Sequence, residues 1–216
     1  MARLLVVSCT PKGPLSRTRR LLDAWLAKRR TADPALAVDE VDLVDTELPL
    51  VDGPVALAKG SVAAGSQLTP TQQRAWEAIV PWAREFLAAD EVVIAAPMWN
   101  FSLPYPVKHY LDVVVQPGLL FRYTAQGPHG LCGGKPLTLV TTRGSAYADL
   151  PQVNFQTSYL RWLCEFIDCR YSEVVAEGLD ARGPEAGEKI LTEVIDRLQS
   201  PPQAVVRSGG TGSGNA

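Results

Sequence analysis

Short apolar runs alternate along the chain with longer stretches in which apolar residues recur every three or four positions. Near-continuous apolar segments at residues 4–7, 91–96, 135–142 and 171–176, with an alternating segment at 38–44, predict five strands. Helical spacing predicts five helices, at residues 16–30, 69–87, 105–115, 152–167 and 184–198. Strict alternation favours a parallel sheet with helices on both faces and right-handed crossovers. Two common strand orders fit, one of them 2-1-3-4-5.

Two long connections and the chain end interrupt this alternation. Residues 45–68 and 116–134 carry prolines, glycines and small residues, and loops of that length are usually functional or cover a partner. The pattern Thr69-Pro70 followed by Gln72 predicts a capping box that starts the second helix. From Ser200 the chain is rich in Gly, Ser and Pro, so we expect a single domain over residues 1–199 and a disordered tail over 200–216.

Composition narrows the class of protein. A chain of 216 residues with 46% hydrophobic and 20% charged content can bury a full α/β core. The 21 Lys+Arg against 23 Asp+Glu give a net charge of -2, which offers no surface for nucleic acid or a membrane. Four cysteines without a C-x-x-C pair and two histidines give no metal site and fit a reducing compartment. With no signal sequence or membrane-length apolar run, we expect a cytoplasmic protein.

The loop at residues 8–18 joins the first strand to the first helix, where α/β folds bind phosphate. Free N–H groups at the helix start and the helix dipole favour an anion, and Thr10, Ser16 and Thr18 add hydroxyls. The alternative is that Ser16 is a plain helix cap. The chain has neither the dinucleotide fingerprint nor a Walker loop. Seven residues separate Cys9 from Arg17, too many for a phosphatase cradle, so we expect Cys9 to be a small buried residue.

Two further turns end the third and fourth strands. Met98 and Trp99 offer apolar surface to a flat ring, and Asn100 and the backbone N–H groups of this turn can bond to ring heteroatoms. In the other turn, Gly144 permits close approach of the backbone to a ligand. Each turn alone is equally compatible with a purely structural role. Three strand ends that converge on one crevice favour a flavin site.

Four segments, at residues 68–73, 96–101, 121–128 and 142–144, carry a resemblance to a known family. Across residues 3–198 the chain is similar to the FMN-dependent NADH:quinone oxidoreductases of the azoreductase family. The resemblance implies an α/β, flavodoxin-like three-layer sandwich, with a five-stranded parallel sheet in the order 2-1-3-4-5 and helices on both faces. It also implies a homodimer with two shared sites.

The resemblance assigns roles residue by residue. The residues implied to contact the FMN phosphate are Thr10, Ser16, Arg17 and Thr18. Those implied to hold the flavin ring are Met98, Trp99, Asn100 and Phe101 on one side, and Thr142, Arg143, Gly144 and Ser145 on the other. Phe121 and Tyr123 are implied to wall the substrate pocket. The chain has Trp99 where the family usually has Tyr, and Ser145 where it has a second Gly, so the resemblance leaves its substrate range open.

The implied activity is transfer of two electrons from NADH through FMN to quinones and azo compounds. Donor and acceptor are expected to use one site in turn, by a ping-pong scheme, and the cofactor supplies the chemistry without a side-chain nucleophile. Two alternatives remain open: an electron carrier that exposes its flavin to a protein partner, and a flavin-binding regulatory protein without turnover. The near-neutral charge and the long loops disfavour the carrier.

Overall fold

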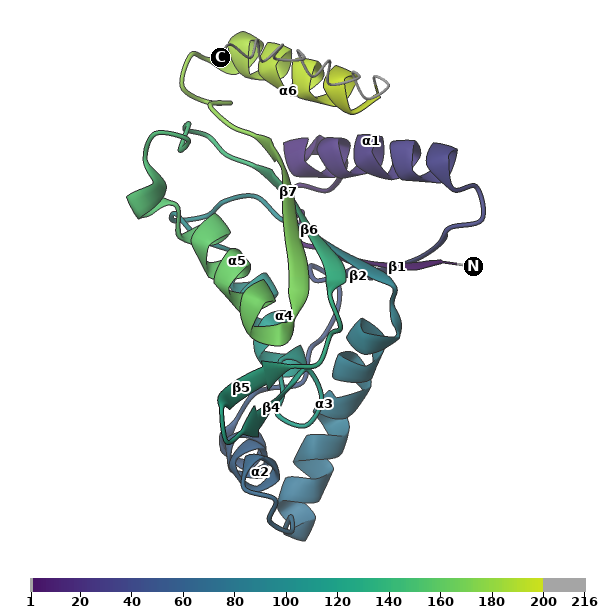
Figure 1. The fold of residues 1–216 in the computed structure, drawn as a ribbon. Helices are drawn as coiled ribbons and strands as arrows, with labels where there is room; N and C mark the ends of the chain where they lie inside the picture. Colours follow the sequence, from purple (N-terminus) through teal and green to yellow (C-terminus); the bar gives the residue numbers. More distant parts are fainter. Residues whose placement is uncertain (1, 200–216) are drawn as a thin grey trace, which may run out of the picture.

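A five-stranded parallel sheet forms the centre of the protein in the computed structural model, which describes residues 2–199 (Figure 1). Its strands are β1 (Arg3–Ser8), β2 (Ala37–Asp42), β3 (Glu91–Ala95), β6 (Lys135–Thr142) and β7 (Cys169–Ala176). They lie in the order β2-β1-β3-β6-β7. Counted along the chain, these five strands have the predicted order 2-1-3-4-5, and every neighbouring pair is parallel.

Helices cover both faces of this sheet. They are α1 (Arg17–Ala32), α2 (Gly53–Ala63), α3 (Pro70–Ala88), α4 (Tyr105–Val114), α5 (Phe155–Ile167) and α6 (Pro184–Gln199), with 3-10 turns at Gly13–Leu15 and Pro151–Val153. Helices α1 and α6 lie on one side of the sheet, and α3, α4 and α5 lie on the other (Figure 1). The three-layer arrangement predicted from the sequence is therefore confirmed. None of the helices in residues 2–199 is long and apolar enough to cross a membrane.

Alternate residues of each central strand supply two separate cores, because successive side chains point to opposite faces. Leu5 and Val7 of β1 join the core under α3, α4 and α5, which includes Phe86 and Tyr110. Leu4 and Val6 of β1 join the core under α1 and α6, together with Leu21 and Leu191. Burial on both faces explains why these strands are near-continuously apolar in sequence.

Both segments expected to be loops contain regular structure, which corrects the sequence analysis. Residues 45–68 include α2, whose Val55 packs with Ile79 of α3 and Val113 of α4 in a small satellite core. Residues 116–134 include an antiparallel hairpin of β4 (Phe121–Thr124) and β5 (Gly127–Gly130). The helix α2 has few large apolar residues, and the hairpin strands have four residues each, so neither shows a clear periodic pattern.

The starts of the other five helices lie within a few residues of the positions predicted from the sequence. Thr69 and Gln72 form the predicted capping box at the start of α3, with Pro70 at the first helical position. The helix expected from residue 152 begins instead at Phe155, because the Asn154 side chain accepts a hydrogen bond from the Thr157 amide and caps it there. The expected tail at 200–216 lies outside the described residues.

Candidate functional site

The carboxyl ends of β1, β3 and β6 border one cavity of about 270 Å³, together with the segment that follows β7. Its lining residues are Pro11, Lys12, Leu15, Ser16, Arg17, Thr18, Pro97, Met98, Trp99, Thr142, Arg143, Gly144, Leu179 and Asp180. The site thus lies at the sheet edge where open α/β folds bind ligands. The strand ends predicted to converge do so.

The start of α1 supplies an anion-binding corner to this cavity. Ser16 is the N-cap and its Oγ accepts from the Arg19 amide at 3.3 Å, so the capping role given above as the alternative to phosphate contact is present. The other N–H groups of the first turn have no partner within the helix, and that turn contains no acidic residue. The Thr18 hydroxyl is buried and bonds to that of Thr142 at 2.6 Å, which joins α1 to β6. A phosphate is the ligand that suits this corner.

The turn after β3 has a strained backbone. Trp99 and Ser102 exchange two backbone hydrogen bonds, of 3.0 and 2.9 Å, around Asn100 and Phe101. These two central residues have φ of 46° and 68°, which a type I′ turn requires and which a residue such as Phe adopts at a cost. Trp99 and Phe101 remain 42% and 51% exposed. The turn therefore presents aromatic rings to the outside at the cost of backbone strain, as binding sites often do.

One buried residue that the sequence analysis missed, Gln156 of α5, holds the ends of β3 and β6 together. Its Nε2 donates to the Pro97 carbonyl at 3.2 Å, and its backbone N–H donates to the Phe101 carbonyl at 3.1 Å. Its Oε1 accepts from the Thr141 hydroxyl at 3.1 Å and from Arg143 Nε at 3.2 Å. With no exposed surface, this amide fixes the spacing of the two turns that flank the cavity.

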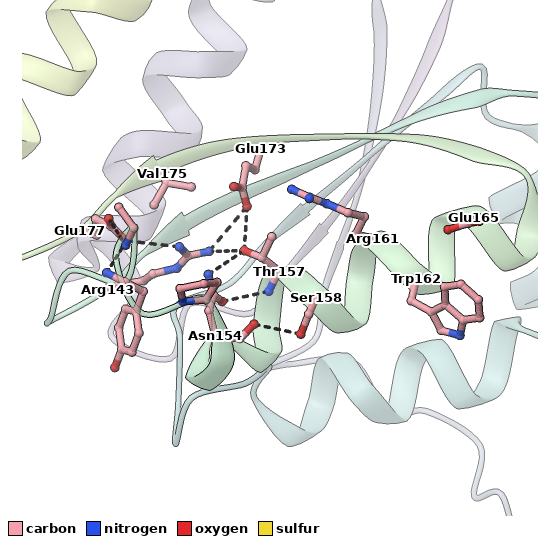
Figure 2. Close-up of a pocket in the computed structure, with 13 residues that line it drawn as sticks. Arg143, Asn154, Thr157, Ser158, Arg161, Trp162, Glu165, Glu173, Val175 and Glu177 are labelled. Carbon is pink, nitrogen blue, oxygen red and sulfur yellow. Dashed lines mark hydrogen bonds and ion pairs between the residues drawn. The ribbon is translucent and has the colours of Figure 1, made fainter.

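The Arg143 side chain is committed to a structural network. Its guanidinium donates to the Thr157 hydroxyl at 2.7 Å and pairs with Glu177 at 3.3 Å and Glu173 at 3.6 Å, as Figure 2 shows. This network forms the floor of a second, shallower pocket of about 550 Å³ between α5 and β7. The guanidinium is therefore occupied away from the cavity of about 270 Å³, which Arg143 still helps to line. Its backbone N–H donates to the Ala176 carbonyl at 2.9 Å, and its carbonyl accepts from the Leu179 amide at 3.2 Å.

Asp180 also lines the cavity and was not predicted from the sequence. It pairs with Arg17 at 2.6 Å, while Arg17 donates as well to the Leu179 carbonyl at 3.0 Å. The Asp180 amide donates to the Gly144 carbonyl at 2.9 Å. A Cβ on Gly144 would lie 2.5 Å from Asp180 Oδ2. A side chain on Gly144 would therefore displace the Asp180 carboxylate.

The residues predicted to bind the cofactor fall into two groups. Those that line the cavity are Ser16, Arg17, Thr18, Met98, Trp99, Thr142, Arg143 and Gly144; those that flank it without lining it are Thr10, Asn100, Phe101 and Ser145. Phe121 is 3% exposed and packs against Phe166, whereas Tyr123 is 63% exposed on the hairpin. Neither lines the cavity.

Burial and charge at the site fit a phosphorylated flavin. Hydroxyls and helix N–H groups at the start of α1 suit the phosphate, and the apolar surface of Met98 and Trp99 suits a ring. Cys9 is fully buried, as predicted, and burial raises the pKa of its thiol to about 11, which makes it a poor nucleophile at neutral pH. Residues 2–199 contain no group of three or more His, Cys, Asp or Glu arranged to hold a metal ion.

Comparison with known proteins gives the same class. A family model described as the flavodoxin-like fold matches residues 2–200. The chain is 35% identical to an FMN-dependent NADH:quinone oxidoreductase of Nitratidesulfovibrio vulgaris, over 92% of this chain and 97% of that one. It is 39% identical to the protein of that name from Ruegeria pomeroyi, over 77% and 84% of the two chains.

Solved structures agree. The azoreductase of Bacillus anthracis superposes with a TM-score of 0.82 at 30% identity, over 92% of this chain and 97% of that one. The sheet order and the strand-end cavity define a flavodoxin-like protein. Within that class, the chain belongs to the family of FMN-dependent NADH:quinone oxidoreductases and azoreductases.

Proposed function

We propose that the protein is an FMN-dependent oxidoreductase that transfers two electrons from NADH to quinones and azo compounds. The observation that carries this proposal is the single cavity shared by the start of α1, the 97–102 turn and the end of β6. The names of the relatives and of the similar azoreductase structure support the same chemistry. The substrate range is proposed to depend on Trp99 and Ser145, which depart from the family pattern.

The residues of the chain position and bind, whereas bound FMN would supply hydride acceptance and donation. Ser16, Thr18 and the first-turn N–H groups would hold the phosphate, with Thr10 and Arg17 beside them. Met98 and Trp99 would lie against the ring, with Asn100, Phe101 and Ser145 at its edge. Fixed backbone dipoles from the two turns would favour negative charge on the ring, and Gln156 keeps those turns in place. A ping-pong order follows if donor and acceptor share the open face.

We further propose a homodimer. Exposed aromatic residues lie on α5, on the turn after β3 and on the β4-β5 hairpin. They are Phe155 and Trp162 of α5, Phe101 of the turn and Tyr123 of the hairpin. The Phe101 carbonyl accepts from the first turn of α5, and hairpin residues 128–130 border a pocket with Trp162. Large aromatic side chains exposed in this number along one helix and its neighbours support a contact surface there. Through it, Tyr123 of one copy would reach the substrate site of the other, with the buried Phe121 packed behind it. We place one FMN-binding domain over residues 1–199 in a cytoplasmic protein.

The absorbance spectrum of the purified protein, followed by turnover, tests this function. We expect flavin bands from bound FMN and rapid NADH oxidation only after benzoquinone or an azo dye is added. Initial rates over a grid of both substrates should give parallel double-reciprocal lines, as a ping-pong order demands. Flavin that is bound but not reduced by NADH would instead favour the regulatory protein. Flavin reduced only by a partner reductase would favour the electron carrier, and protein that refuses added FMN would refute the site.

A further inference from the structure

Three of the four cysteines lie together at the end of the sheet opposite the flavin cavity. Cys132 follows the β4-β5 hairpin, Cys164 is in the last turns of α5, and Cys169 begins β7. Their exposed fractions are 8%, 1% and 9%, and all three belong to the core beneath α3, α4 and α5. All are free thiols in the structure. The proposed electron transfer uses none of them.

Backbone pairing brings Cys132 and Cys169 onto adjacent chain segments. The Cys132 amide donates to the Ile167 carbonyl at 3.0 Å, and the Gly134 amide donates to the Asp168 carbonyl at 2.9 Å. Lys135, at the start of β6, is the register partner of Cys169. The segment from Cys132 to Lys135 therefore runs beside residues 167–169, and Cys132 and Cys169 both contribute side chains to the core beneath α3, α4 and α5.

The two sulfur atoms are chemically different. A hydrogen bond from the Cys169 thiol lowers the pKa of Cys132, and the positive charge of Lys135 lowers it further against the opposing effect of burial. The same hydrogen bond raises the pKa of Cys169. Lys135 is itself held in place, because its Nζ donates to the carbonyls of Leu87 and Ala89. Cys132, whose pKa is lowered, is therefore the better nucleophile of the two, and Cys169 is the partner thiol beside it.

We propose that Cys132 and Cys169 are a peroxide-oxidisable pair that closes to a reversible disulfide. The Cys132 thiolate attacks one oxygen of hydrogen peroxide, the O–O bond breaks, and water leaves after one proton is taken up. The resulting sulfenic acid is attacked by the Cys169 sulfur, the S–O bond breaks, and a second water leaves with the Cys169 proton. The two thiols lose two electrons and two protons, and one peroxide becomes two waters.

The disulfide would tie the segment that leaves the β4-β5 hairpin to the first residue of β7. Two other cysteines serve as internal controls. Cys164 lies next to the pair, but burial raises the pKa of its thiol to about 12, so it remains a thiol. Cys9 lies after β1, at the far end of the sheet, and is fully buried. The proposal is independent of the flavin chemistry.

The test treats the purified full-length protein with a small excess of hydrogen peroxide and then counts thiols after denaturation. We expect the four thiols to fall to two, a dithiol reductant to restore them, and peptide mass mapping to show Cys132 joined to Cys169. Cys164→Ala and Cys9→Ala should form the same cross-link. In Cys169→Ser, the sulfenic acid on Cys132 should persist and be trapped by dimedone, whereas Cys132→Ser should lose no thiol under the same treatment.

Several results would overturn the proposal. Four thiols that persist in the wild-type protein would do so, and so would a cross-link that joins Cys164 instead. Thiol loss in Cys132→Ser at the wild-type rate would show that Cys132 is not the reacting group. Because mapping of the wild-type protein decides the bond, the test stands even if a variant fails to fold.

Discussion

Gln156 shows how much of the site depends on one side chain. Its side-chain amide makes three hydrogen bonds: those with Thr141 and Arg143 are buried, and that to the Pro97 carbonyl is partly buried. Removal of a buried partner leaves the remaining groups unsatisfied, which costs about 1–3 kcal/mol for each group. Gln156 therefore ties the two turns together beside the direct hydrogen bond from the Met98 amide to the Thr142 carbonyl at 3.1 Å.

For Gln156→Leu we expect a loss of stability of about 3 kcal/mol and FMN affinity weaker by roughly tenfold, or about 1.4 kcal/mol. Thermal melting with saturating FMN and fluorescence titration of FMN measure the two effects. The matched control is Gln152→Leu, which makes the same change at an exposed position of the preceding 3-10 turn. Unchanged FMN affinity in Gln156→Leu would show that the turns hold their spacing without the amide.

The position of the Asp180 side chain depends on the absence of a side chain at Gly144. We expect Gly144→Ala to push Asp180 away from Arg17, since the new Cβ would lie 2.5 Å from Oδ2, and so to weaken FMN binding. Asp180→Ala removes that oxygen and leaves the nearest remaining atom, Asp180 Cβ, at 3.6 Å. FMN affinities of the two single variants and the double variant form a thermodynamic cycle. A strong positive coupling is expected, and additive losses would mean that the clash does not govern the site.

The sequence predicts residues such as Ser16, Thr18 and Met98 because each follows a strand that ends at one sheet edge. This inference requires only the order of strands and helices along the chain. Gln156 and Asp180 could not be predicted in this way. Gln156 is polar at a helical position that looks like any other, and Asp180 reaches the cavity only because residues 179–180 pair with 143–144 after both strands have ended. Such contacts arise from tertiary pairing and leave no local signal.

At the scale of elements, the turn after β3 stores strain that a substitution can release. Phe101 has φ of 68°, which glycine adopts readily and phenylalanine does not. Its ring makes one edge contact, with Tyr147 at 6.3 Å, and is half exposed. The ring is therefore retained at a cost in stability, which a role in ligand or partner contact explains.

We expect Phe101→Gly to raise the stability of the protein without FMN by about 1 kcal/mol while it lowers turnover with quinones. Chemical denaturation and steady-state kinetics measure the two effects. Phe101→Leu serves as the control, because it keeps a side chain at positive φ and should not stabilise. If Phe101→Gly destabilises instead, the ring contributes more packing than its exposure indicates.

The central strands of the sheet could be predicted because both of their faces are buried, which makes them near-continuously apolar. The amphipathic helices could be predicted because one buried face repeats apolar residues at helical spacing. The helix α2 and the β4-β5 hairpin escaped for the same reason. Only Val55 and Ala58 of α2 are buried, and of the hairpin only Phe121 is buried. Both elements are held by contacts with α3 or α5 that a single sequence does not reveal.

At the scale of the whole molecule, the aromatic face along α5 makes the proposed homodimer testable. Trp162 is 69% exposed in the middle of that helix, bordered by Glu165 and the hairpin residues of a neighbouring pocket. A large aromatic residue so placed is costly to expose and typical of an interface core. A charge at this position would have to be buried unpaired against the partner copy.

We therefore expect wild-type protein to have twice the mass of one chain in solution and Trp162→Glu to shift toward one chain, which light scattering after size exclusion measures. Ala27→Glu, at an exposed position of α1 in the opposite layer, should leave the mass unchanged. If Tyr123 of one copy completes the site of the other, Trp162→Glu should also lose quinone turnover while it still binds FMN, because the cavity belongs to a single chain. A wild-type protein with the mass of one chain would refute the dimer. A dimeric Trp162→Glu would place the interface on another face.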